Sequence, residues 1–223
     1  EWQYRGFIPS RRIPLDGEKT DEPVRTRGWT NWHHLFTPRQ LLIQGLTAET
    51  STRFSTNDVE SVACLLGLGR MADWNARLSA WMYHAGNEKG NQVFYNQALN
   101  CHSNYAARAL PKLVETFCIL SSIGEYGDKF DATVELVDAR DLRHICDLWI
   151  TDPPYADAIS YHELGDFFLS WYEKQLAHVF PSWTADSRSE LAVRGDGDAF
   201  RRAMVDIYKN LTRHMPDNGM QMV

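Results

Sequence analysis

Hydrophobic and polar residues follow a helical period through most of the first half of the chain. Apolar side chains recur at three- and four-residue steps in two segments, which predicts one helix that begins near Pro38 and another that runs from Val59 to His84. Thr37 favours the first helix start because its hydroxyl can cap free N–H groups, and proline suits the next position because it has none. A third helical pattern covers residues 104–121.

The second half of the chain mixes short strand-like runs with amphipathic helices. A valine-rich alternating stretch predicts a strand of about six residues that ends near Val137. An apolar run predicts another strand from His144 to Thr151. Two helical periods and a last strand follow, at residues 162–180, 198–215 and 220–223. This order of elements predicts an α/β fold with part of an open sheet.

These patterns predict three regions. Residues 1–30 are rich in Arg, Pro, Asp and Gly without a sustained period, so we expect an extended arm or loop, either a plain linker or a basic arm that touches nucleic acid. Residues 31–125 form a helical segment, and residues 126–223 form the α/β half. The chain begins without methionine and stops within a strand pattern, so we expect it to be an internal piece of a longer protein.

Composition narrows the function classes only slightly. The formal net charge of -6 gives no overall basic field, so nucleic-acid binding would need a local basic face. No apolar run is long enough to span a membrane and no signal peptide is visible, so we expect a cytoplasmic protein without a membrane partner. The 4 cysteines form no CxxC pair and the histidines no HExxH spacing, which predicts reduced thiols and no metal site.

The candidate chemistry lies where the two predicted strands end. Asp138 follows "TVELV" and Asp152 follows "DLWIT", and ligands of open α/β sheets bind beyond such strand ends, so we expect both acids to face one crevice. Pro153 and Pro154 have no N–H, which leaves nearby carbonyls free to face a ligand. A carboxylate and a carbonyl together suit an exocyclic amine, and Tyr155 offers a face on which a base can stack.

Residues 147–164, "DLWITDPPYADAISYHEL", resemble the (D/N/S)PP(Y/F/W) motif of S-adenosylmethionine-dependent amino-methyltransferases. The longer run is similar to the C-terminal portion of adenine-specific DNA methylases described as containing a Zn-ribbon. "VDARDL" and "HLFTPRQLL" resemble the acidic motif and the FTP-type helix start of such enzymes. The resemblance implies a Rossmann-like methyltransferase core with a helical N-terminal segment, S-adenosyl-L-methionine as cofactor, and DNA methylation on adenine N6.

The resemblance also assigns roles to individual residues. The implied catalytic residues are Asp152, Pro153, Pro154 and Tyr155. The implied cofactor-binding residues are Phe36, Thr37, Pro38, Asp138 and Ala139. The implied substrate-binding residues are Tyr155, Asp157 and Tyr161.

The sequence departs from the family in two respects. It has no FxGxG loop, because the glycines of "CLLGLGRM" lie in a helical pattern that favours helix packing, and it lacks the Zn-ribbon cysteines. We therefore expect this segment alone to bind the cofactor poorly or not at all. Glu163 and Asp166 either face the crevice or form the polar side of a helix, and for Glu163 we favour the latter.

Other functions remain open at this point. The motif also suits cytosine N4 in DNA, a base in RNA, or a protein glutamine amide, although the aspartate argues mildly against the last. In a different class, the chain could be a catalytically silent nucleic-acid-binding subunit that joins partner subunits in a restriction-modification or defence complex.

Overall fold

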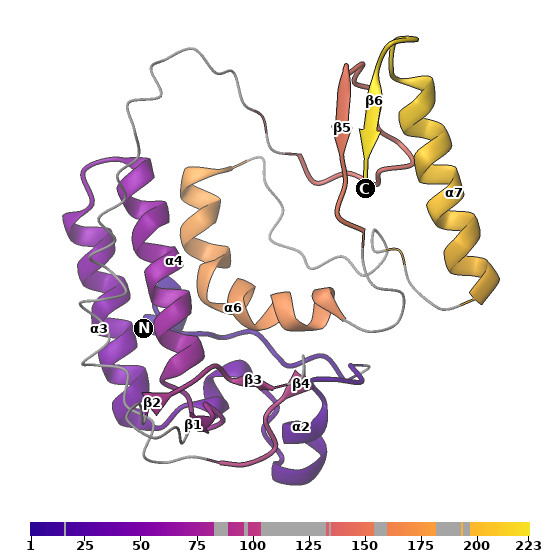
Figure 1. The fold of residues 1–223 in the computed structure, drawn as a ribbon. Helices are drawn as coiled ribbons and strands as arrows, with labels where there is room; N and C mark the ends of the chain where they lie inside the picture. Colours follow the sequence, from indigo (N-terminus) through magenta and orange to yellow (C-terminus); the bar gives the residue numbers. More distant parts are fainter. Residues whose placement is uncertain are drawn as a thin grey trace. The chain divides into compact units, whose positions relative to one another are not determined.

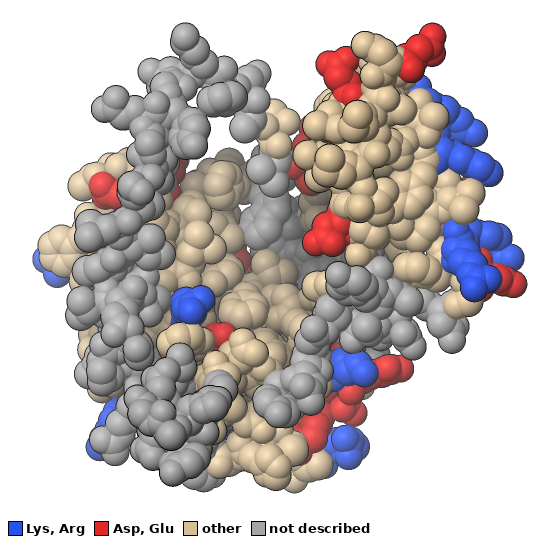
Figure 2. Space-filling view, viewed as in Figure 1, with Lys and Arg blue, Asp and Glu red and all other residues tan. Residues whose placement is uncertain are grey.

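The computed structural model describes residues 1–15, 17–82, 89–95, 98–103, 133, 135–153, 160–181, 193 and 197–223, and the other residues are grey in Figures 1 and 2. The chain divides into two units. Unit 1 comprises Glu1–Gly124 and Glu163–Ser187, and unit 2 comprises Glu125–His162 and Arg188–Val223. This division differs from the expected regions, because most of the helix predicted at 162–180 clusters with the N-terminal segment. The helix expected at 104–121 lies outside the described residues.

Unit 1 is mainly helical. Its helices are α1 (Trp2–Arg5), α2 (Glu22–Arg27), the 3-10 helix η1 (Trp32–Leu35), α3 (Pro38–Phe54), α4 (Asp58–Trp74) and most of α6 (Tyr161–Val179). Two small antiparallel pairs are formed by β1 (Trp81–Met82) with β2 (Lys89–Gly90), and by β3 (Phe94–Tyr95) with β4 (Ala98–Leu99).

The starts of α3 and α6 agree with the sequence prediction, but α4 is shorter than predicted. Asn75, beyond its last residue Trp74, has a non-helical conformation. The Ser79 hydroxyl accepts a hydrogen bond from the Ala76 N–H (2.8 Å) and donates one to the Asp73 carbonyl (2.9 Å). Ser79 thereby satisfies backbone groups at the helix end, which explains why the helix does not continue to His84.

The N-terminal segment is not an extended arm, which corrects the prediction for residues 1–30. It contains α1 and α2, and its Phe7, Ile13 and Thr20 side chains are buried. Apolar residues in this segment have no period, because they are spaced along turns and short helices. Their burial depends on residues far away in the chain, which local patterns cannot reveal.

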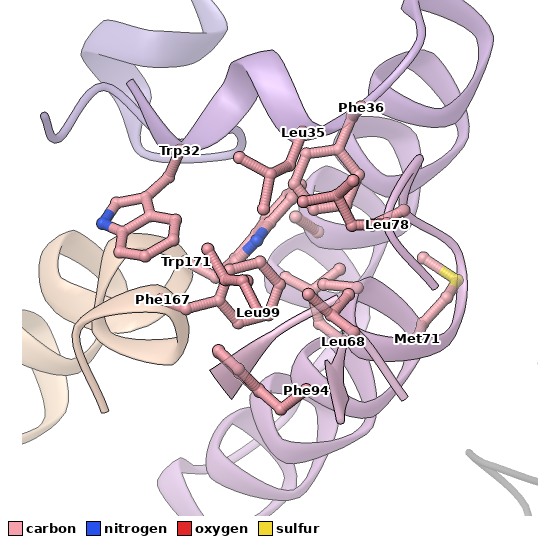
Figure 3. Close-up of a cluster of buried hydrophobic side chains, with 14 of the residues drawn as sticks. Trp32, Leu35, Phe36, Leu68, Met71, Leu78, Phe94, Leu99, Phe167 and Trp171 are labelled. Atoms are coloured by element: carbon pink, nitrogen blue, oxygen red, sulfur yellow. The ribbon is translucent and has the colours of Figure 1, made fainter. Parts of the chain in front are cut away.

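An aromatic cluster forms the core of unit 1 (Figure 3). Phe167 of α6 packs edge-on against Trp32, with ring centroids 5.6 Å apart, and against Phe94 at 5.5 Å. Trp171, one helical turn further along α6, packs edge-on against Phe36 at 5.2 Å. These pairs add to the stability gained from burial, and they join α6 to the segments around residues 32–36 and 94.

The glycines of α4 serve helix packing, as the sequence favoured. Gly67 and Gly69 are buried within the helix. A Cβ added at Gly69 would lie 1.5 Å from the hydroxyl oxygen of Tyr172 on α6. Glycine is therefore required here so that α6 can approach α4 closely, and this segment is not a cofactor loop.

A buried carboxyl group, that of Asp73, lies near the contact between α4 and α6. Asp73 of α4 accepts a hydrogen bond from the Val93 N–H (2.8 Å). Burial raises the pKa of Asp73 to about 6, against the opposing effects of that hydrogen bond and of Arg70. Burial and the nearby Asp73 charge together raise the pKa of Tyr172 to about 12.

Asp73 should make the stability of unit 1 depend on pH. Its pKa is higher in the folded protein than the ordinary 3.8, so its stabilising effect is complete at low pH and is lost as pH rises through about 6. Asp73→Asn keeps an acceptor for the Val93 N–H but cannot ionise. Relative to the wild type, its free energy of unfolding in urea titrations should rise by about 1.4 kcal/mol between pH 5 and pH 8. The exposed Asp198→Asn is the control, and an equal pH profile for both variants would contradict this role.

Unit 2 contains a two-stranded parallel sheet and one long helix. The strands β5 (Leu148–Ile150) and β6 (Met220–Met222) pair in parallel, with Leu148 opposite Met220 and Ile150 opposite Met222. The helix α7 (Gly197–Arg213) precedes β6 and buries Ile207 and Leu211. The sequence predicted α7 and β6 correctly, while β5 is shorter than the predicted strand from His144 to Thr151.

The predicted strand ending near Val137 is wrong for residues 135–137, which form no strand. The side chains of Leu136 and Val137 are about half exposed, and no described strand pairs with them. An alternating pattern produces a strand only where a partner strand accepts its backbone hydrogen bonds. The described part of unit 2 therefore combines helices with a parallel sheet, but this sheet is too small to establish a Rossmann-like core.

Among the described helices, none is long and apolar enough to cross a membrane.

Candidate functional site

Asp152 lies directly beyond the carboxyl end of β5. The Thr151 N–H donates to the Met222 carbonyl (2.9 Å), so pairing with β6 continues to the residue before the acid. The Asp152 side chain is exposed and Pro153 is half-buried. This position leaves a carboxylate at a strand end with its oxygen atoms open to a ligand. Pro154, Tyr155 and Asp157 lie outside the described residues.

Asp138 lies in a tight turn of the same unit. Its carbonyl accepts the Asp141 N–H (2.8 Å), and its carboxylate accepts the Arg140 backbone N–H (2.9 Å) and the Arg140 side chain, whose Nε lies 2.9 Å and 3.0 Å from the two oxygens. The hydrogen bonds from the Arg140 side chain are the largest cause that lowers the pKa of Asp138. The Asp138 carboxylate therefore stays ionised at neutral pH, and hydrogen bonds from Arg140 already use part of its accepting capacity.

Asn210 of α7 fixes this turn, and the sequence reading did not single it out. Its side-chain amide donates to the carbonyls of Ala139 (3.0 Å) and Leu142 (3.1 Å). Asn210 is buried beside Leu211 on the apolar face of α7. A polar residue on the buried face of an amphipathic helix needs a partner, and this signal in "DIYKNL" could have identified it.

The helix start at α3 is a complete capping box. The Thr37 hydroxyl accepts the Gln40 N–H (3.3 Å), and the Gln40 side chain accepts the Thr37 N–H (2.8 Å). Because Pro38 has no N–H, Arg39 provides the one backbone donor in the first turn for which no described partner is recorded. An anion could be held there by this N–H and the positive end of the helix dipole.

Phe36 lies in the core of unit 1, whereas the resemblance implied a cofactor-binding residue. Its side chain is 4% exposed and packs against Trp171 and Phe167 in the core. It can support the position of the helix start, but its ring has almost no surface to offer a cofactor. We therefore retain Thr37 and Pro38 as candidates and assign Phe36 to the core.

Glu163 and Asp166 of α6 neither face a crevice nor form a solvated side, which corrects both expectations. Glu163 is buried and accepts the N–H groups of Glu18 (3.2 Å), Lys19 (2.8 Å) and Thr20 (3.1 Å). It thus anchors the N-terminal segment to α6. Tyr161, the first residue of α6, is 54% exposed and remains available to a ligand.

Asp166 forms a second anchor one turn along α6. Its carboxylate accepts the Trp32 indole N–H (2.7 Å) and pairs with Arg11 Nη1 at 2.5 Å, while Glu173 pairs with Arg11 Nη2 at 3.0 Å. Such buried acids need donors, and here the donors come from a segment more than a hundred residues away in the chain.

The described residues contain no group of His, Cys, Asp and Glu side chains that could hold a metal ion. Among them, Cys64, Cys101 and Cys146 are free thiols. Comparison with protein-family models, with curated proteins and with solved structures finds no match to this chain.

Proposed function

We propose that this chain is part of an S-adenosylmethionine-dependent amino-methyltransferase that methylates adenine N6 in DNA. The observation that carries the proposal is Asp152, an exposed acid followed by two prolines and a tyrosine, placed directly beyond the carboxyl end of a strand in a parallel sheet. A Rossmann-like core in which β5 and β6 are neighbours belongs to the same proposal.

In this mechanism the Asp152 carboxylate and the Pro153 carbonyl each accept a hydrogen bond from one N–H of the adenine amine. These two hydrogen bonds localise the nitrogen lone pair for in-line attack on a methyl group. The cofactor would supply the methyl group to the amine nitrogen and leave as the neutral thioether, while the Asp152 carboxylate would take the proton that the methylated amine loses and pass it to water. The base reaches this position by leaving the duplex and stacking on Tyr155.

The residues present fit several groups of the cofactor, which supplies an electrophilic methyl group. The ionised Asp138 can accept hydrogen bonds from hydroxyl or amine groups, as the cofactor's nucleoside offers. Ala139 belongs to the turn that carries Asp138. Taken by itself, unit 1 offers the helix start at Thr37 and Pro38, where Arg39 has an N–H and a guanidinium that suit a carboxylate.

The proposal is tested by calorimetric titration of the intact protein with S-adenosylmethionine. Asn210→Ala releases the turn at Asp138, so it should weaken cofactor affinity about tenfold, which corresponds to about 1.4 kcal/mol. The matched control is Asn218→Ala, because Asn218 is exposed in the turn before β6. Absence of cofactor binding by the wild type would favour a silent subunit over an enzyme.

A further inference from the structure

The outer face of α7 carries a row of basic side chains. Arg202, Lys209 and Arg213 are exposed, and a helical period places them on one face, opposite the buried Ile207 and Leu211. Figure 2 shows blue side chains along this edge of α7. With a rise of about 1.5 Å per residue, the row extends over roughly 16 Å.

The acids of α7 reduce the positive charge of this row but do not cancel it. Asp206 is exposed on the same face, four residues after Arg202 and three before Lys209, and it also helps to raise the pKa of Arg140 after the larger effect of Asp138. Asp198 pairs with Arg201 at 3.7 Å. No ion pair between the row and any other described residue is recorded, so the three cations of the row face solvent in a chain of net charge -6.

A surface depression lies beside the basic row of α7. It is lined by Val205, Tyr208, Lys209, Thr212 and Arg213. The Thr212 hydroxyl already donates to the Tyr208 carbonyl (2.8 Å), so the Tyr208 hydroxyl is the one that can contact a phosphate oxygen beside the cations. The apolar part of the depression suits a sugar.

We propose that this face of α7, defined by Arg202, Lys209 and Arg213 with the adjoining depression, binds the phosphate backbone of duplex DNA. The choice of nucleic acid rests on the proposed function, while the surface itself rests on charge and geometry. A duplex carries one negative charge per about 1.7 Å of its axis, so a straight row of three cations meets phosphates without a specific sequence. The face therefore contributes affinity for DNA that flanks the target base, and no base specificity.

The test measures binding of a 30-base-pair duplex to the intact protein by fluorescence anisotropy across a salt series, without cofactor. The triple variant Arg202→Gln, Lys209→Gln, Arg213→Gln should lower the slope of log affinity against log salt by about 2–3, since each phosphate contact contributes about 0.9. The matched control removes the same charge from unit 1, through Arg12→Gln, Arg25→Gln and Arg53→Gln, and should leave the slope within about 0.5 of the wild type.

A second variant distinguishes a loss of DNA binding from a loss of folding. Val205→Glu places one negative charge in the depression, at an exposed position, and should lower the affinity without changing the circular dichroism spectrum. An unchanged salt slope in the triple variant would overturn the α7 assignment even if methyl transfer is intact. A slope that falls as expected would support it even if no methyl transfer is found, and equal affinity for polyglutamate and for the duplex would overturn the choice of nucleic acid.

Discussion

Replacing Asp152 by alanine should reduce methyl transfer by at least about a thousandfold while the protein stays folded. The carboxylate is an acceptor for the reacting amine in the proposed transition state, and loss of one such group costs about 10²–10³ in rate before any loss of proton removal is added. Because the side chain is exposed, its removal leaves no buried group unpaired.

The same strand provides a matched control. Asp147 is also an exposed acid, but it directly precedes β5 and so lies at the opposite end of the strand. Asp147→Ala should retain full transfer, and cofactor affinity should be similar in both variants. If the two variants lose activity equally, the acid at the carboxyl end of β5 has no special role.

Replacing Asp166 by alanine should lower the free energy of unfolding of unit 1 by about 3–5 kcal/mol, as expected when one partner of a buried ion pair is removed. The change leaves the Trp32 indole N–H without its acceptor and removes a carboxylate that pairs with Arg11. Chemical denaturation followed by tryptophan fluorescence measures this loss.

Two further variants separate the causes. Asp166→Asn retains an oxygen that can accept from Trp32, so it should lose less stability than the alanine variant. Asp198→Ala removes an ion pair in which both side chains are at least 80% exposed, so it should change stability by no more than about 0.5 kcal/mol. A loss of less than about 1 kcal/mol in Asp166→Ala would show that the anchor contributes little.

The sequence predicted the elements whose formation depends on residues that are close together along the chain. Thr37 and Pro38 cap α3 as expected, because a capping box is complete within four residues. The periods of α6 and α7 were clear because each helix has one apolar face. Asp152 was correctly placed at a strand end, since an apolar run followed by prolines cannot continue a central strand.

Features that depend on distant contacts could not be predicted. The burial of the N-terminal segment depends on Glu163, which binds backbone groups of Glu18–Thr20 across more than a hundred and forty residues of sequence. The alternating residues before Asp138 resemble a strand, but a strand also requires a neighbour, and no sequence pattern reports whether one is there. The pattern of α7 could have marked Asn210 as a polar residue on a buried face, but its partners, carbonyl groups of another segment, could not be named from the sequence.

The most direct measurement of the central claim is nucleoside mass spectrometry of DNA incubated with the intact protein and methyl-labelled S-adenosylmethionine. We predict label in N6-methyldeoxyadenosine with the wild type and none above background with Asp152→Ala. Label in N4-methyldeoxycytidine would keep the enzyme class and change the target base. Unlabelled DNA with a wild-type protein that binds the cofactor, or equal labelling by both proteins, would contradict the account.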